Sequence, residues 1–204
     1  MREMGLQSIT TYSKRDYQKS VRMGKKQNIL QRQFHVSEPN RVWVSDVTCF
    51  KINEKYIYVC VILDLFSRKV IAHGVSPKNS TYLITSTFKR AIQSRGATQG
   101  LTFHSDQGAQ YTSKAFSKLL RMNKVVQSFS KSGRPHDNAV AESFFASMKR
   151  EEIYRTQYKS ERQFRESIDS YINFYNTQRP HSTLAYKTPE KLEALYEAKK
   201  NRGG

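Results

Sequence analysis

The sequence predicts a mixed α/β domain, and three features carry this prediction. Three apolar runs rich in β-branched residues follow one another with short polar turns between them, at 41–52, 54–67 and 68–76. This spacing is typical of an antiparallel meander. Beyond it, helix-like and strand-like stretches alternate, which adds strands to the same sheet. With 37% hydrophobic residues in 204, the chain can build one sizeable core plus appendages.

The elements are expected in the following order. Residues 1–34 are polar and basic without a sustained apolar period, so we interpret them as an arm or linker. The meander supplies strands one to three, and LTFH at 101–104 and VVQSF at 125–129 supply strands four and five. The prediction is therefore a five-stranded mixed sheet flanked by helices.

Helical periodicity marks the segments that should cover this sheet. One helix spans 81–95 and ends before Gly96, a second spans 112–122, and a third follows a cap at Asn138. A long helix stops before Pro180, and the last begins near Pro189. The inward-facing residues expected on these helices are Leu83, Ile84, Thr87, Phe88, Ala91, Ile92, Ala115, Phe116, Leu119, Leu120, Val140, Phe144, Met148, Phe164, Ile168, Tyr171 and Tyr175.

The charge balance points to a polyanionic partner. Thirty-five basic against 17 acidic residues give a net charge of +18 and a pI near 10.0, which favours nucleic acid over a membrane. The basic arm is expected to order only on DNA. No apolar run approaches the roughly 20 residues of a membrane span, and 1–30 holds no signal-peptide core, so we expect a cytoplasmic, nucleoid-associated protein. Cys49 and Cys60 suggest neither a disulfide framework nor a zinc site and are interpreted as buried strand residues.

Three carboxylates stand out because acidic residues are rare between 41 and 150, where six accompany 17 basic residues. Asp46 lies inside the first apolar strand, where desolvation is costly without a partner. Asp106 follows the fourth strand, at the sheet edge where α/β proteins bind ligands. Glu142 lies on the helix after Asn138. Taken singly, Asp106 is better interpreted as a turn residue and Glu142 as a solvated helix residue. The two can converge with Asp46 only if strands one and four are neighbours.

Three converging carboxylates would need neutralising, and divalent cations do this. Mg²⁺ binds few carboxylates and keeps positions open for phosphate oxygens and water. A pair of such ions can stabilise both the attacking and the leaving oxygens of a phosphodiester displacement. The sequence therefore favours a Mg²⁺ site, with Mn²⁺ as a substitute, inside a basic surface that holds the DNA backbone.

At these residues the chain resembles a known family. WVSDVT, YVCVILDLFSRKVIAH, FHSDQGAQY, SGRPHDNAVAESFFASMK and YINFYNTQRPHSTL resemble, in this order, the integrase-core transposases (OrfB) of bacterial insertion sequences, which are related to retroviral integrases. The resemblance runs from about residue 40 to 190. Between Asp106 and Glu142 lie 142 − 106 − 1 = 35 residues, the spacing of the family's DDE signature.

The resemblance implies a ribonuclease-H-like core with Asp46, Asp106 and Glu142 as catalytic metal ligands. It also implies the activity: hydrolysis of a phosphodiester at the element's end, then attack of the freed 3′-hydroxyl on a second phosphodiester in the target DNA. The core works as a homo-oligomer in such transposases. Full-length relatives carry a helix-turn-helix region upstream, so we expect it from a longer reading frame or a partner protein. On this basis the chain divides into a basic N-terminal arm (1–38), an integrase catalytic core (39–158) and a C-terminal helical extension (159–204).

Further residues receive secondary predictions. Lys149, two helical turns after Glu142, Arg134 and Asn138 are candidate DNA contacts, although Asn138 also fits a helix cap and Arg134 a solvated arginine. Asp64, bonded to the turn at Ser67 and Arg68, and Asp137 are expected to support the site. The remaining expectations are that His104 and His136 are turn and loop residues rather than metal ligands, that His181 packs under the last helix, and that Tyr171, Phe174 and Tyr175 make core contacts in preference to stacking on bases.

Three functions remain open. The first is a Mg²⁺-dependent transposase core that cuts and joins DNA strands. The second is a truncated, catalytically incomplete transposase that only binds DNA. The third is a nuclease that uses the same site without joining strands. The fold alone does not choose among them.

Overall fold

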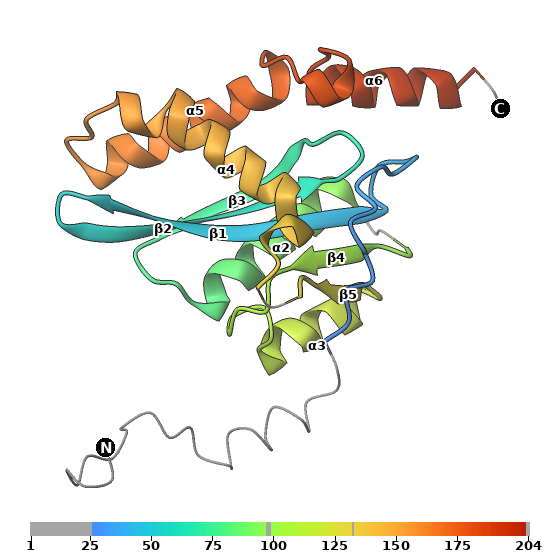
Figure 1. The fold of residues 1–204 in the computed structure, drawn as a ribbon, viewed down its shortest axis with the longest axis horizontal. Helices are drawn as coiled ribbons and strands as arrows, with labels where there is room; N and C mark the ends of the chain where they lie inside the picture. The colour runs from blue at the N-terminus through green and yellow to red at the C-terminus, as the bar shows by residue number, and fades with distance from the viewer. Residues whose placement is uncertain (1–25, 97–98, 132, 203–204) are drawn as a thin grey trace, which may run out of the picture.

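The computed structural model describes residues 26–96, 99–131 and 133–202, and its centre is a five-stranded sheet in the order β3-β2-β1-β4-β5 (Figure 1). The strands are β1 (Val42–Ile52), β2 (Lys55–Asp64), β3 (Val70–Ser76), β4 (Thr102–Ser105) and β5 (Val126–Phe129). β1, β2 and β3 form an antiparallel meander. β4 pairs parallel with β1, and β5 pairs parallel with β4. The mixed five-stranded sheet predicted from the sequence is confirmed.

Helices cover both faces of this sheet. They are α2 (Thr81–Arg95), α3 (Lys114–Met122), α4 (Ala139–Glu151), α5 (Glu161–Thr177) and α6 (Pro189–Lys200), with short 3-10 helices η2 (Pro135–Asn138), η3 (Ile153–Arg155) and η4 (Ser182–Leu184). The side chains of Ser80, Ser113, Ser160 and Thr188 cap α2, α3, α5 and α6 by accepting a backbone N–H of the first turn. None of the described helices is both long and apolar enough to cross a bilayer.

The sheet separates two hydrophobic cores (Figure 1). α4 and α5 pack on one face, where Phe144, Met148 and Phe164 meet the side chains of β1 and β2. α2 and α3 pack on the other face around Trp43 and Phe88. Alternate residues of β1 point to opposite faces, so Val44 belongs to the first core and Trp43 to the second. Asp46, two residues after Val44, therefore points to the α4 side.

The arm expected to order only on DNA is partly docked without it. Gln27 O accepts the backbone N–H of Phe129 at 2.9 Å, so the segment lies beside β5. Ser128 Oγ accepts the N–H groups of Ile29 (2.9 Å) and Leu30 (3.2 Å), and Leu30 is buried in the first core. The expectation is wrong for residues 26–34, and for residues 1–25 it lies outside the described residues.

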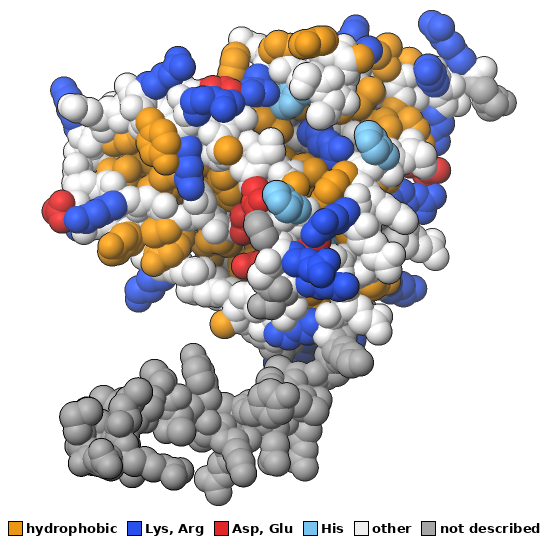
Figure 2. Space-filling view, viewed as in Figure 1, with side chains coloured by type: hydrophobic (Ala, Val, Ile, Leu, Met, Phe, Trp, Pro, Cys, Tyr) orange, Lys and Arg blue, Asp and Glu red, His pale blue; other side chains and the backbone are white. Residues whose placement is uncertain are grey.

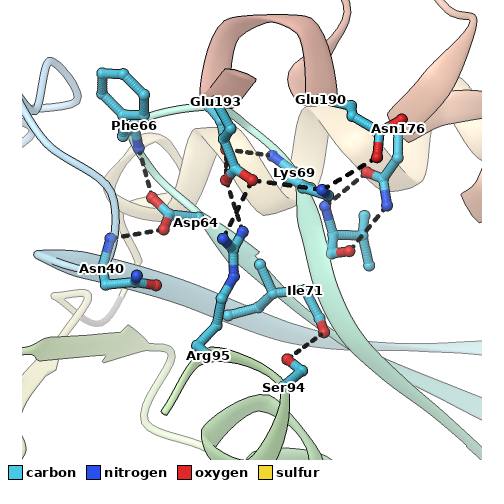
Figure 3. A network of polar contacts seen from close by, with 12 residues as sticks. Asn40, Asp64, Phe66, Lys69, Ile71, Ser94, Arg95, Asn176, Glu190 and Glu193 are labelled. Carbon is cyan, nitrogen blue, oxygen red and sulfur yellow. Dashed lines mark hydrogen bonds and ion pairs between the residues drawn. The ribbon is translucent and has the colours of Figure 1, made fainter. Parts of the chain in front are cut away.

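The C-terminal helix α6 is tied to the rest of the domain mainly through Glu193, and Glu190 adds a longer ion pair with Lys69 at 3.7 Å (Figure 3). The Glu193 carboxylate accepts hydrogen bonds from Arg95 (2.6 and 3.1 Å) and from Ser67 Oγ (2.7 Å), and it pairs with Lys69 at 3.4 Å. The Glu193 side chain is 12% exposed. Burial opposes its ionisation, but the hydrogen bonds and charges of Arg95, Ser67 and Lys69 together lower the pKa of this carboxyl. α6 is thus anchored to the end of α2 and to the turn after β2.

Several buried positions differ from expectation. Cys49 is exposed, because near the tip of the β1–β2 hairpin its side chain points to the α2 face of the sheet, whereas Phe50 beside it is buried on the α5 face. Cys60 is buried as expected. Ala115 is exposed, since α3 buries only Phe116 and Leu120 completely. Phe174 is 39% exposed, while Tyr171 and Tyr175 are buried in the first core.

Candidate active site

The strand register brings Asp46 and Asp106 together. β1 and β4 are neighbours, and their parallel pairing matches Val42 with Thr102 and Val44 with His104, an offset of 60 residues. The same offset places Asp46 beside Asp106, just beyond the paired segment, at the carboxyl end of β4. The adjacency of strands one and four is confirmed. Asp106 Oδ1 accepts the N–H of Gly108 at 3.0 Å, which holds the carboxylate in the turn that ends β4.

Glu142 reaches the same place because the start of α4 is fixed to β1. Asn138 is the residue before α4, but its side chain makes no capping hydrogen bond, so the cap prediction is wrong. Its Nδ2 instead donates to the backbone oxygen of Ser45 at 3.1 Å, directly before Asp46. Asn138 is 5% exposed, and its Oδ1 is buried without a hydrogen-bond partner among the described residues. Asn138 thereby holds the first turn of α4, which carries Glu142, close to Asp46.

The three carboxylates line one cleft of about 440 Å³. The other residues that line it are Gln107, Gly108, Ser130, Lys131, Gly133, Arg134 and Asn138. Asp106 and Glu142 are exposed, and Asp46 is half-buried. Figure 2 shows acidic side chains near the middle of this face, with Lys and Arg side chains around them. A DNA backbone that approaches this face thus meets basic groups around an acidic centre.

Asp46 carries the strongest electrostatic perturbation in the cleft. Burial above all, and then the charges of Asp106 and Glu142, raise the pKa of its carboxyl to about 7. The N–H of Val47, which Asp46 Oδ1 accepts at 2.8 Å, and the Lys149 ammonium act in the opposite direction. A carboxyl with two like-charged neighbours is one that a cation would stabilise.

His104 lies behind the cleft in β4 and is not the turn residue expected. Its ring is fully buried between Ser128 Oγ (2.9 Å from Nδ1) and Ser130 Oγ (3.1 Å from Nε2), and burial lowers its pKa to about 4. Because Ser128 Oγ accepts two backbone N–H groups, its own hydrogen goes to Nδ1, and Nε2–H then donates to Ser130. Neutral His104 thus fixes Ser130 at the cleft wall. His136, by contrast, is exposed in η2, as a loop residue should be.

Asp137 joins the described part of the N-terminal arm, residues 26–34 (hereafter the linker), to the turn that precedes α4. Its carboxylate accepts hydrogen bonds from Asn28 Nδ2 (2.9 Å), Arg32 Nε (2.7 Å) and the N–H of Lys131 (3.0 Å). These contacts lower the pKa of this carboxyl; the Lys131 N–H has the largest effect and Arg32 the next largest. The linker contacts gave no signal in the sequence, because they are polar and lack periodicity. Ser130 and Lys131 were also not predicted as residues of the cleft, because neither belongs to a recognisable catalytic or binding motif.

The other predicted residues lie around the cleft. Arg134 is exposed at its wall. Lys149 is absent from the residues that line it, and its Nζ lies 5.8 Å from the centre of the Phe50 ring. Asp64 is remote from the cleft: it accepts the N–H groups of Asn40 (2.7 Å) and Phe66 (2.9 Å), and burial raises its pKa to about 6 (Figure 3). Asp64 therefore holds the entry to β1 rather than the carboxylates.

His181 is buried, as a packing residue should be. It packs edge-on against Tyr175 of α5, with ring centres 4.5 Å apart. Burial lowers the pKa of its ring. A bond between its Nε2 and the Tyr175 backbone oxygen, at 3.4 Å, completes a structural contact with α5.

Comparison with solved structures identifies the class of fold. The chain is similar to the integrase of a simian T-cell lymphotropic virus intasome, with a TM-score of 0.69 and 18% identity over 78% of this chain and 56% of that one. It is also similar to the HTLV-2 integrase catalytic core solved in complex with magnesium, with a TM-score of 0.61 and 18% identity over 76% of this chain and 97% of that one. The fold is the ribonuclease-H-like fold of retroviral integrase catalytic cores.

Sequence comparison identifies the family. Residues 36–135 and 123–189 each match an integrase core domain. The transposase of insertion sequence IS904 from Lactococcus lactis is 34% identical over 95% of this chain and 77% of its own length. The chain belongs to the integrase-core transposases of bacterial insertion sequences, and it is a transposase/integrase catalytic core, which makes it a polynucleotidyl transferase by class.

Two Escherichia coli relatives are longer than the region matched. The IS150 transposase InsK is 32% identical over 79% of this chain and 57% of its own length. The IS3A transposase InsF is 33% identical over 82% of this chain and 58% of its own length. The chain therefore spans less than two thirds of these two proteins.

Proposed function

We propose that the chain cleaves DNA strands and joins them during transposition, with Asp46, Asp106 and Glu142 as the catalytic and metal-binding residues. The observation that carries the proposal is the convergence of these carboxylates, from β1, β4 and α4, on one cleft. Family membership supports the same activity.

The cleft suits Mg²⁺, with Mn²⁺ as a substitute, in the chemistry of its donors. Carboxylate oxygens are ligands of these hard cations. The raised pKa of Asp46 reflects burial first and the negative charges of Asp106 and Glu142 second, and a bound cation would offset both. Among the described residues, no three His, Cys, Asp or Glu side chains stand close enough to hold one ion jointly. Mg²⁺ is usually bound through one or two carboxylates, so the proposal does not require three on one ion. The HTLV-2 core, of the same fold, was solved with magnesium. Bound cations would polarise the phosphodiester and stabilise the charge that develops on its oxygens.

The chain's own residues fix where this chemistry takes place. Asn138 holds α4 against β1, so that Glu142 stays on the side of the cleft that faces Asp46. The exposed Arg134 is placed to contact a phosphate at the cleft wall, and Lys149 to contact the strand beyond it. Because Asn138 is 5% exposed and its amide is engaged with Ser45, we assign it to positioning α4 rather than to contacting DNA.

DNA, as transposon end and as target, is the partner that this proposal requires. The net charge of +18 supports it. Assembly as a homo-oligomer is part of the proposal, and the viral integrase that shares the fold was solved in an intasome. We also propose that a helix-turn-helix region, upstream or on a partner protein, recognises the transposon ends. Association with the nucleoid is the last part of the proposal.

Glu142→Gln tests the proposal on supercoiled plasmid, which needs no knowledge of the element's ends. The substitution should reduce Mn²⁺-dependent nicking by about a hundredfold or more. Salt-sensitive binding of duplex DNA should stay within about twofold, because dispersed Lys and Arg side chains supply it. Glu166→Gln, on an exposed part of α5, is the matched control and should nick normally.

The outcome separates the candidate functions. Equal loss of nicking and binding in Glu142→Gln would contradict the assigned role. A wild-type chain that binds DNA but nicks none would favour the DNA-binding alternative, which no observation supports at present. Nicking without joined products would identify a nuclease.

A further inference from the structure

A second groove lies beside the active-site cleft, between the tip of the β1–β2 hairpin and the segment that joins α4 to α5 (Figure 1). Its volume is about 770 Å³. The residues that line this hairpin groove are Cys49, Phe50, Lys51, Ile52, Asn53, Lys149, Ile153, Tyr154, Thr156, Gln157, Tyr158 and Lys159. The function proposed above makes no use of it beyond Lys149.

The groove is basic. Lys51, Lys149 and Lys159 line it, and none of the described residues that line it is acidic. Lys51 pairs with Glu54 at 2.6 Å, but the Glu54 side chain is 88% exposed, so water and salt weaken this pair and a phosphate can replace it. Lys149 is held over the Phe50 ring, which keeps its ammonium at the groove wall. The walls therefore suit an anionic chain.

The groove also offers an aromatic surface. Tyr154, in η3, is 77% exposed although its neighbour Ile153 is buried. Phe50 and Tyr158, which both pack on Phe164, add apolar surface to the lining. Lysines interleaved with an exposed aromatic ring are the combination by which proteins bind unpaired nucleic acid, with phosphates on the cations and a base stacked on the ring.

The groove continues the active-site cleft. Lys149 lies seven residues after Glu142 on α4, a rise of about 10 Å along the helix. Lys149 lines the groove and not the cleft, but its charge lowers the pKa of Asp46, so its ammonium lies near enough to act on that carboxylate. A stacked DNA strand advances about 3.4 Å per nucleotide, so about three nucleotides separate the cleft from the groove.

We propose that the hairpin groove binds the unpaired DNA strand that runs on from the phosphodiester held in the cleft. Lys51, Lys149 and Lys159 hold its phosphates, and Tyr154 stacks on a base. Stacking needs a free base face, so the bound segment is single-stranded or frayed rather than duplex. This inference rests on the proposed function, because it takes the cleft as the place of cleavage.

The protein carries its own probe for this groove. Cys49 lines it and is exposed, and Cys60, the only other cysteine of the chain, is fully buried. DNA with a single-stranded extension would carry, at successive positions, a nucleotide tethered to a mixed disulfide with a small thiol. The Cys49 thiolate attacks the tethered sulfur, a protein–DNA disulfide forms, and the small thiol leaves with the electron pair.

Trapping should be confined to a few adjacent positions of the extension and should disappear in Cys49→Ser. Tyr154→Ala should weaken binding of the extension about tenfold and leave duplex binding unchanged. Tyr82→Ala is the matched control, because Tyr82 is 79% exposed on α2, on the opposite face of the sheet. Lys159→Ala should lower the salt dependence of binding by about one counterion.

Trapping that is equal at all positions, or a Tyr154→Ala variant that binds like Tyr82→Ala, would overturn the inference. A Tyr154→Ala variant that changes only the oligomeric state would also overturn it and would assign the groove to protein. Mn²⁺-dependent plasmid nicking by the wild-type chain keeps the two proposals apart. Nicking without positional trapping refutes the groove alone, and trapping without nicking supports the groove while refuting the catalytic function.

Discussion

Asp137→Asn should destabilise the fold more than the same substitution at an exposed aspartate, because Asp137 holds the linker against the turn that precedes α4. The side chain is 3% exposed and accepts three hydrogen bonds. An asparagine that keeps its oxygen toward Asn28 and Lys131 turns its amide N–H groups toward Arg32. One bond with a charged group is then lost, at about 1.5–3 kcal/mol. The two remaining hydrogen bonds have a neutral amide oxygen as acceptor in place of a carboxylate, and each becomes roughly half as strong.

The expected total is about 2–4 kcal/mol, measured by urea unfolding at pH 7.5. For a chain of this size it corresponds to a fall in Tm of roughly 5–15 °C. The contacts lower the folded-state pKa of Asp137, so its stabilisation is present above the ordinary aspartate pKa and is lost as pH falls through the lowered value. The difference between wild type and variant should therefore shrink in acid.

Asp169→Asn is the control, because it removes the same charge from a side chain that is 67% exposed. It should cost less than about 0.5 kcal/mol. Arg32→Ala should cost less than Asp137→Asn, since the other two donors remain and the Arg32 side chain is 45% exposed. If Asp137→Asn unfolds at the same urea concentration as Asp169→Asn, the linker is not fastened through this residue.

Two further predictions concern the cleft and the C-terminal helix. The pKa of Asp46 is raised to about 7 in the folded protein, so the metal-free chain should lose stability as pH rises from about 4 to 7, and Mg²⁺ should restore it at pH 8. Thermal melts in chelator would show this trend for the wild type and a weaker one for Asp46→Asn; parallel curves would contradict it. Glu193→Ala leaves Arg95 without its partner and should loosen α6, with faster hydrogen exchange in 189–200 than in β1 and a cost of about 1–3 kcal/mol. Unchanged exchange in 189–200 would show that Glu193 does not hold the helix.

The sheet was predictable because its signals are local. The β-branched runs and the one-turn apolar spacing each follow from a single element, so all five strands and the main helices were found. The neighbour relation of β1 and β4 was a hypothesis until the parallel register confirmed it, because strand order depends on packing between distant segments.

The candidate site was only partly predictable. Its three carboxylates stand out in a basic chain, but Asn138 and the linker act through polar bonds to distant partners. The docking of residues 26–34 left no periodic signal, because it uses backbone N–H groups on Ser128 and side chains on Asp137 rather than an apolar face. His104 was expected in a turn because it directly precedes the turn sequence that begins at Ser105. The two serines that bury it, Ser128 and Ser130, lie 24 and 26 residues away in the chain, so no local pattern indicated them.

Anomalous diffraction from a crystal soaked in Mn²⁺ would show whether the three carboxylates form a metal site, and it needs neither the element's ends nor its target. We expect a manganese peak coordinated by the carboxylates of Asp46 and Asp106, with Glu142 on the same cleft. A peak that is lost in Asp46→Asn and kept in Asp169→Asn would assign the site. A well-ordered crystal with no manganese at these carboxylates would contradict the catalytic role proposed for them.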